Sequence, residues 1–221
     1  CVITMPGAER RCDGCEASFA EAGFPPPLRV AGERHREGRE SMHDTITRAH
    51  RLLLQDFAAQ GLHERWHLLV LEDDARVVGG DSTDLEAALS ALRRRHPAWR
   101  TLHVGHVPLG PCVPVDGAVH HSTLPYTAHA VLYSRAHFPD ANPDPTRWGR
   151  PWFFEGMMSV PLGEKFALIP SLCTQCEMPK EMKEVPLLRD LSYAQGEKAM
   201  VDIALGLRWL VPPVPMASFS A

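Results

Sequence analysis

Three consecutive acidic residues, Glu72, Asp73 and Asp74, directly follow the aliphatic run 68–71. Four aliphatic residues in a row indicate a strand that is covered on both faces. Three adjacent negative charges at the end of such a strand repel one another unless a cation or hydrogen-bond donors neutralise them. Because side chains alternate along a strand, Glu72 and Asp74 should point to one side and could share a cation, while Asp73 points to the other.

Carboxylate oxygens as the only protein ligands favour Mg²⁺ or Mn²⁺, and substrate phosphates and waters then complete the coordination shell. An acidic strand end of this kind therefore points to a nucleotide-diphosphate donor that is held through a divalent ion. The alternative is a solvated junction between a strand and a loop, where acidic residues are common. Both interpretations remain open from this stretch alone.

The composition indicates an ordinary globular protein. The chain has 221 residues, of which 44% are hydrophobic and 23% charged, which suits a single domain with a sizeable core. A formal net charge of −4 argues against a general polyanion binder, and the short basic clusters at 34–39 and 93–95 suit solvated surfaces. We find neither a membrane-spanning apolar stretch nor a signal peptide, so we expect a cytoplasmic protein.

Four of the six cysteines form two CxxC pairs, Cys12 with Cys15 and Cys173 with Cys176. Together the pairs could bind zinc or form disulfides. Their separation far exceeds the compact spacing of a zinc ribbon, so we expect buried or free thiols. A zinc-stabilised binding module without catalytic activity is the alternative from another functional class.

Hydrophobic periodicity predicts the elements that position the acids. A strand over 2–5, a helix over 8–22 and a strand over 28–31 open the chain, and this order is typical of the α/β class. Proline- and glycine-rich stretches before 128 and over 139–151 predict loops. The remaining predictions are helices over 41–57 and 84–95, the latter beginning near residue 82, and strands over 68–71, 101–104, 128–133 and 166–169.

Six short motifs occur in a fixed order over about residues 2–180. They are Glu9-Arg10-Arg11, Ser41-x-His43, Leu71-Glu72-Asp73-Asp74-Ala75, Leu102-His103-Val104-Gly105, Ala130-Val131-Leu132-Tyr133-Ser134-Arg135 and Pro170-Ser171-Leu172-x-x-Gln175. The series resembles glycosyltransferase family 25, the lipooligosaccharide and procollagen galactosyltransferases. Two departures stand out: the second motif carries an extra residue, and Glu155 follows Pro151 where the family has a Pro-x-Asp segment.

The resemblance implies a GT-A fold, which is a Rossmann-like single domain with a mixed, mostly parallel central sheet flanked by helices. Residues 1–105 would form the nucleotide-sugar-binding half, 106–210 the acceptor half and 211–221 an irregular tail. The implied activity is an inverting, metal-dependent transfer of a hexose from a UDP-sugar to a hydroxyl group. The acceptor could be a saccharide, a protein or a hydroxylated base in DNA, although the acidic net charge disfavours DNA.

The donor and metal sites are predicted at the carboxyl ends of parallel strands, where α/β folds gather ligands. Asp74 and Glu72 are the predicted ligands of Mn²⁺ or Mg²⁺. The predicted contacts to the nucleotide sugar are Thr4, Pro6, Arg10, Gly32, Glu33, Glu72 and Asp73.

An inverting transfer, as the resemblance implies, needs a carboxylate that takes the proton of the acceptor hydroxyl. Glu155 is our candidate for this base, and Asp116 and Asp144 are second choices. Glu155 follows Trp152, Phe153 and Phe154, and apolar surroundings raise the pKa of a carboxylate toward the range that suits a general base.

Overall fold

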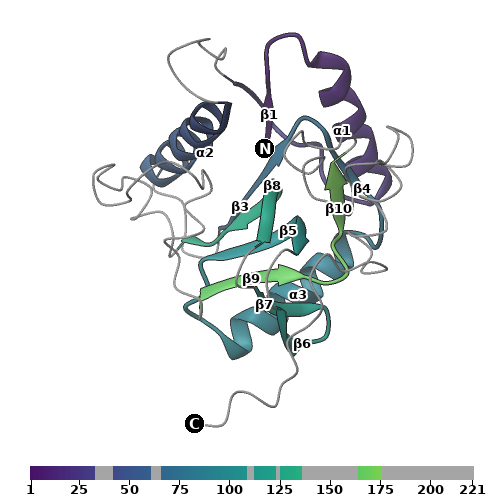
Figure 1. Ribbon diagram of the computed structural model, residues 1–221, viewed down its shortest axis with the longest axis vertical. Coiled ribbons are helices and arrows are strands. Elements are labelled where there is room, and N and C mark those ends of the chain that lie inside the picture. The colour runs from purple at the N-terminus through teal and green to yellow at the C-terminus, as the bar shows by residue number, and fades with distance from the viewer. Residues whose placement is uncertain (33–41, 61–65, 109–111, 123–124, 136–163, 176–221) are drawn as a thin grey trace, which may run out of the picture.

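The computed structural model describes residues 1–32, 42–60, 66–108, 112–122, 125–135 and 164–175. These residues form one mixed sheet with helices on both of its faces (Figure 1). The elements are, in order, β1 (Val2–Thr4), α1 (Glu9–Glu21), β2 (Arg29–Ala31), α2 (Met42–Ala59), β3 (Leu68–Glu72), β4 (Ala75–Val77), α3 (Ser82–Arg95), β5 (Thr101–Pro108), β6 (Cys112–Asp116), β7 (Val119–Ser122), β8 (Pro125–Tyr133), β9 (Lys165–Leu168) and β10 (Cys173–Gln175).

The strands lie in the order β2-β1-β3-β8-β5-β9-β7-β6, and β10 pairs with both β5 and β4. β1 is parallel to β2 and β3, and β9 and β10 are parallel to β5. β8 lies between β3 and β5 and is antiparallel to both. It follows that β1, β2, β3, β5, β9 and β10 all run in one direction. The predicted mixed, mostly parallel sheet flanked by helices is confirmed.

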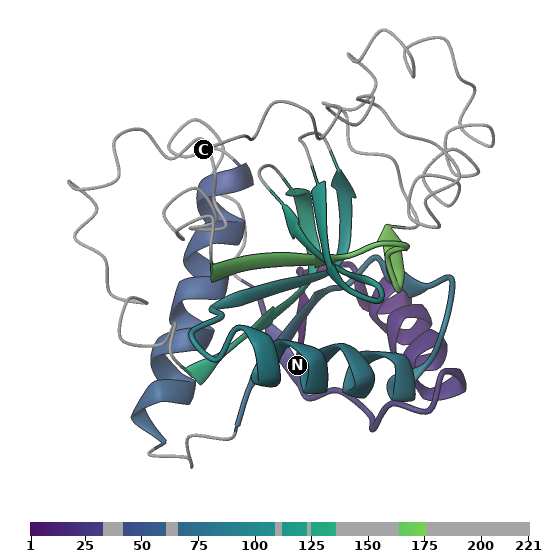
Figure 2. The ribbon, with the colours of Figure 1, turned by 90° about the horizontal axis from the view of Figure 1, so that it is seen from below.

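The two faces of the sheet bury different helices. Cys12, Cys15 and Phe19 of α1 pack with Leu85 and Leu92 of α3 in one hydrophobic cluster. On the other face, Leu54 of α2 packs against a second cluster that contains Ile3, Val70 and Val131. Alternation along the strands explains this division, because neighbours such as Val2 and Ile3 belong to different clusters. Figure 2 shows α2 and α1 well apart, with strands of the sheet between them.

The predicted start of α3 is confirmed, and its cause is local. Asp81 is the N-cap residue, and its carboxylate accepts hydrogen bonds from the N–H groups of Thr83 and Asp84. The carboxylate of Asp84 in turn accepts from the N–H of Asp81 at 2.9 Å. This reciprocal capping box satisfies amide groups that the first helical turn leaves without intrahelical partners.

Four short strands were not predicted. β6 and β7 form a hairpin inside the segment that was expected to be a loop, and its turn contains Gly117 at φ +55. The Asp116-Gly117 pair is a hairpin signal that this prediction overlooked. β4 and β10 pair with each other and have three residues each, too few for a periodic pattern to show.

Several predicted features lie outside the described residues. They are the candidate base Glu155, the second choice Asp144, the donor contact Glu33, Cys176, the basic cluster at 34–39 and the tail at 211–221. The division into halves at residue 105 therefore stays a prediction. In the described ranges we find no helix with both the length and the apolar character needed to cross a membrane.

Gly105 on β5 gives a test of the core. A Cβ atom there would lie 2.4 Å from Nε2 of the buried His129 and 3.0 Å from the Cβ of Cys173. We expect Gly105→Ala to lower the free energy of unfolding by about 1–3 kcal/mol, because a buried ring has no room to move away. Urea denaturation measures the change. The loss of stability caused by Gly105→Ala should be smaller in the His129→Ala variant than in the wild-type protein. Equal losses in the two backgrounds would contradict the proposed clash.

Candidate functional site

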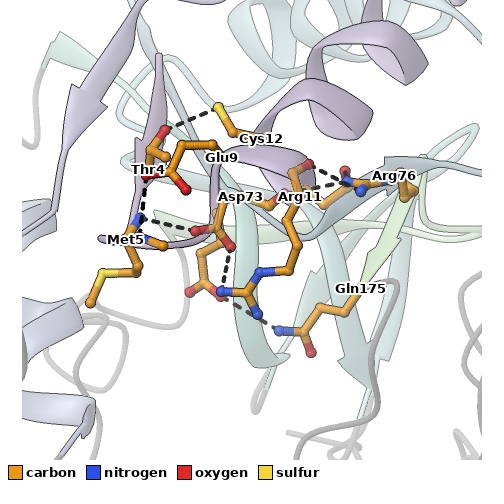
Figure 3. Close-up of polar contacts among 11 residues, drawn as sticks. Thr4, Met5, Glu9, Arg11, Cys12, Asp73, Arg76 and Gln175 are labelled. Carbon is orange, nitrogen blue, oxygen red and sulfur yellow. Dashed lines mark hydrogen bonds and ion pairs between the residues drawn. The ribbon is translucent and has the colours of Figure 1, made fainter.

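The acidic turn lies where three strands that run in the same direction come to their carboxyl ends. β1 ends at Thr4, β3 ends at Glu72 and β10 ends at Gln175. Ile3 is the Cα partner of Glu72, and Gln175 is the partner of Ala75, directly after the turn. The acids are thus bordered on one side by the loop between β1 and α1 and on the other by β10 (Figure 3).

Asp73 is held by protein groups at both carboxylate oxygens. Its Oδ2 atom accepts a hydrogen bond of 3.0 Å from the N–H of Met5, and its Oδ1 atom lies 3.1 Å from Nη2 of Arg11. The side chain of Asp73 is only 5% exposed. This carboxylate therefore anchors the loop after β1 and the first turn of α1 to the acidic turn. That Asp73 also contacts the nucleotide sugar stays a prediction.

Arg76 strengthens the same junction from the opposite direction. Its guanidinium donates to the backbone oxygens of Arg11 at 3.1 Å and Ala75 at 2.7 Å. Gly14 makes this path across α1 possible, because a Cβ atom there would lie 2.5 Å from Nη2 of Arg76. Two arginines therefore connect α1 to the acidic turn (Figure 3). Arg11 of α1 reaches Asp73 with its side chain, and Arg76 reaches the backbone oxygen of Arg11 with its own.

Glu72 is in an environment that disfavours its charge. Burial is the main cause that raises its pKa, to about 8, and the nearby charges of Asp74 and Asp73 add to the increase. Nε2 of Gln175 donates to Oε2 of Glu72 at 3.5 Å, and the positive charge of Arg11 also opposes the increase. The like charges of Asp74 and Asp73 repel that of Glu72, and a cation beside these carboxylates would relieve the repulsion.

Gln175 adds a neutral oxygen to this corner. The residue is only 8% exposed. Its Oε1 atom is buried and accepts no hydrogen bond from any residue that the structure describes. A buried carbonyl oxygen without a donor is costly, and a cation or a ligand N–H would satisfy it.

A cavity of about 400 Å³ opens beside the acidic turn, at the beginning of α1. Its lining residues are Pro6, Gly7, Ala8, Glu9, Arg10 and Arg11. The N-cap residue Ala8 makes no side-chain capping bond, so the amide groups of the first helical turn are available to a ligand. The positive end of the helix dipole and two arginines favour an anion here.

The residues of the corner fit a divalent ion whose remaining ligands come from a bound substrate and water. Glu72, Asp74 and Gln175 offer only oxygen ligands, as Mg²⁺ and Mn²⁺ prefer. Among the described residues there is no cluster of three or more His, Cys, Asp or Glu side chains arranged to hold a metal. Mg²⁺ sites commonly use one or two carboxylates and take their other ligands from phosphates and water, so the two acids suffice when a diphosphate lies in the neighbouring cavity.

Most of the predicted contacts to the nucleotide sugar lie together. They surround the cavity and the acidic turn and are Thr4, Pro6, Arg10, Glu72 and Asp73. Gly32 follows β2 and donates its N–H to the backbone oxygen of Thr4 at 2.8 Å, and a Cβ atom there would lie 2.6 Å from Sδ of Met5. Its role is thus to let the neighbouring loop approach closely.

Asp116, a second choice for the base, lies far from this corner. It ends β6, at the opposite edge of the sheet from β1. Its Oδ2 atom lies 3.0 Å from Nε of Arg95 and 3.8 Å from Nη2 of Arg94. Asp116 is therefore paired with α3 in a distant part of the sheet, and it does not form part of this corner.

The cysteines of the described ranges are all free thiols. Cys12, Cys15 and Cys173 are buried, and Sγ of Cys12 accepts a hydrogen bond of 3.0 Å from Oγ1 of Thr4. Burial is the main cause that raises the pKa of Cys15, to about 12. These thiols therefore serve as part of the core beneath α1.

Sequence reasoning missed three parts of the site: Met5, Arg76 and Gln175. Gln175 had an available signal, because it closes the last of the six motifs. The role of Met5 comes from its backbone N–H, which carries no sequence signal. That of Arg76 depends on the packing of α1 against β4, to which Gly14 was the only pointer.

Comparisons with known proteins provide no assignment. No family of known proteins and no curated protein matches the sequence. Two solved structures are similar at 12% identity each. One, A197 from STIV, has a TM-score of 0.44 over 81% of this chain and 86% of its own. The other, a glycosyltransferase involved in the glycosylation of the major capsid of PBCV-1, has a TM-score of 0.45 over 90% of this chain and 98% of its own. At such low similarity the function has to be argued from the residues of this chain.

Proposed function

We propose that this chain is a glycosyltransferase that moves a hexose from a UDP-sugar to an acceptor hydroxyl with the help of Mn²⁺ or Mg²⁺. The observation that carries this proposal is the acidic corner beside the cavity. Glu72 is partly buried next to other negative charges, Gln175 presents a buried oxygen, and a cavity lined by two arginines opens at the beginning of the neighbouring helix. A diphosphate and a divalent ion satisfy all three features together, and the resemblance to family 25 agrees with this interpretation.

In the proposed complex, Glu72 and Asp74 bind the divalent ion, and Gln175 contributes its Oε1 atom or orients Glu72. The cavity at residues 6–11 receives the diphosphate, with Arg10 and the amide groups of α1 as donors. When bound, the ion supplies Lewis-acid stabilisation of the negative charge that develops on the leaving UDP. Asp73 keeps the loop after β1 in place through Met5.

A thermal-shift experiment tests the proposal directly. A ligand that binds the native state must raise the melting temperature, and at about 100 times its dissociation constant it adds roughly 2.7 kcal/mol of stability. We expect UDP-hexoses with Mn²⁺ to raise the melting temperature by several degrees, and the same nucleotides with EDTA to raise it far less. Equal shifts with and without Mn²⁺, or no shift with any nucleotide sugar, would contradict the proposal.

Replacement of Glu155 separates binding from chemistry. If Glu155 takes the proton of the acceptor hydroxyl, Glu155→Gln should leave the Mn²⁺-dependent melting shift by UDP-hexose unchanged. It should lower kcat by about 10² to 10⁴, which is the usual contribution of a general base. Release of UDP in the presence of acceptor measures turnover. A variant that keeps full turnover would exclude Glu155 as the base.

A further inference from the structure

We propose that Arg11 is an internal counter-ion that exchanges partners when the site fills. Its guanidinium neutralises the acidic turn while no divalent ion is bound, and it moves to the donor diphosphate once an ion binds Glu72 and Asp74. This inference rests on the proposed function and assigns to one residue a role in both binding steps.

The position of Arg11 supports both roles. Nη2 of Arg11 lies 3.1 Å from Oδ1 of Asp73, and the same residue lines the 400 Å³ cavity. Its side chain is 38% exposed, while that of Asp73 is 5% exposed. The buried partner is thus fixed, whereas the side chain of Arg11 is partly exposed and the residue borders the cavity.

The backbone of Arg11 is held independently of its side chain. Nη2 of Arg76 donates to the Arg11 carbonyl oxygen at 3.1 Å, and the N–H of Met5 donates to Oδ2 of Asp73 at 3.0 Å. If the guanidinium of Arg11 leaves Asp73, these two bonds still connect α1 and the loop after β1 to the acidic turn. The exchange therefore requires a rotamer change and not a movement of the helix.

The charge of Arg11 acts on the metal ligands as well as on Asp73. Arg11 lies close enough to Glu72 for its positive charge to act on that carboxylate. A positive charge that reaches Glu72 must also repel a dication beside Glu72, so the two cations compete for one negative corner. The unsatisfied Oε1 of Gln175 offers a ligand to a metal ion.

The cavity offers the displaced guanidinium a better partner. A guanidinium forms paired, parallel hydrogen bonds with phosphate oxygens, which a point charge such as a lysine ammonium cannot reproduce. A diphosphate also carries more negative charge than one aspartate. Arg11 would then join Arg10 at the beginning of α1, where the helix dipole already favours an anion.

The proposed exchange predicts effects of opposite sign from one substitution. We expect Arg11→Gln to bind Mn²⁺ alone about tenfold more tightly, because one competing unit charge is gone. The same variant should bind UDP in saturating Mn²⁺ at least about tenfold more weakly, because a charge-assisted pair of hydrogen bonds is lost. The loss of the free Mn²⁺ signal in electron paramagnetic resonance measures the first affinity, and isothermal titration calorimetry measures the second.

Two further variants serve as controls. Arg29→Gln removes the same charge from a guanidinium that pairs with Asp13 and Glu16 on α1, and both affinities should stay within about twofold of wild type because this pair is exposed. Arg11→Lys keeps the charge but not the fork of donors, so it should restore the wild-type Mn²⁺ affinity and recover UDP affinity only in part.

The outcomes separate this inference from the proposed function. Wild-type protein that binds Mn²⁺ neither alone nor together with UDP overturns both. Wild-type protein that binds Mn²⁺, with an Arg11→Gln variant that binds Mn²⁺ equally or more weakly, overturns the inference alone, since that result means that Arg11 is only a brace.

A measurement on the unaltered protein covers the case in which Arg11→Gln does not fold. The side-chain Nε–H signal of Arg11 in a ¹⁵N-labelled sample should shift when Mg²⁺ is added and shift again when UDP follows. A signal that stays in place through both additions overturns the inference.

Discussion

Asp74→Ala should abolish the Mn²⁺-dependent binding of UDP-hexose, with a loss of more than about 100-fold in affinity. Removal of a residue that only hydrogen-bonds to a metal ligand already lowers metal affinity by about 10–100-fold, and Asp74 is proposed as a direct ligand. With Asp74 gone, Glu72 is the one proposed carboxylate ligand left, and burial still raises the pKa of that carboxyl, so protons compete with the ion for it. The variant should therefore lose most of its affinity for Mn²⁺ as well.

The measurement is the melting temperature with UDP-hexose, in Mn²⁺ and in EDTA. Asp56→Ala is a suitable control, because Asp56 is exposed on α2, the helix on the other side of the sheet from α1. It should keep the full Mn²⁺-dependent shift. An Asp74→Ala protein with intact turnover would refute the assignment of the metal ligands.

Acidification from pH 6.5 to pH 4 should remove most of the stability of the fold. Burial lowers the pKa of His50 and His129 to about 4 and that of His106 to about 3, and it lowers the pKa of His103 well below the ordinary value. In the unfolded chain these side chains return to pKa values of about 6.5. Between the two values the unfolded state binds more protons, so the free energy of unfolding decreases as the pH decreases.

The size of this effect is large relative to the total. One pKa unit corresponds to 1.36 kcal/mol, so each histidine with a pKa near 4 contributes about 3 kcal/mol of instability at pH 4. Domains of this kind are stable by only about 5–15 kcal/mol. Glu72 works in the opposite direction, because its raised pKa lets the folded state hold an extra proton between pH 4.5 and 8. One glutamate cannot offset several histidines, so most of the stability should be lost near pH 4.

Urea denaturation at intervals of half a pH unit measures this dependence. His50→Gln should reduce the slope between pH 6 and 4.5, because one buried imidazole no longer takes up a proton on unfolding. A free energy of unfolding that stays constant from pH 6.5 to 4.5 would contradict the lowered pKa values of these buried histidines.

Local patterns predicted the parts of this fold that depend on nearby residues. The strand at Val2, the helix that carries Cys12 and Cys15, and the strand that ends in the acids all follow from periodicity, and each is confirmed. The antiparallel insertion of β8 between β3 and β5 has no such signature, because the sequence of a strand does not record its neighbours.

The candidate site was predictable to a similar limit. The acids were visible because three charges at the end of an apolar strand are unusual. Their individual environments were not, because they are set by distant groups: Asp73 contacts Arg11 and Met5, and Glu72 contacts Gln175, which is 103 residues away in the chain. A sequence does not distinguish a carboxylate that holds a loop in place from one that could bind a cation.

Of the strands that form the corner, β10 is the last to be synthesised. The corner needs Thr4, Glu72 and Gln175 together, and β10 holds Gln175 through pairing with β4 and β5. During synthesis from the N-terminus, the first half of the sheet can therefore assemble while the corner still lacks one wall. A nascent chain that ends before residue 173 would carry every acidic residue of the turn but would lack Gln175, the proposed third oxygen ligand of the corner.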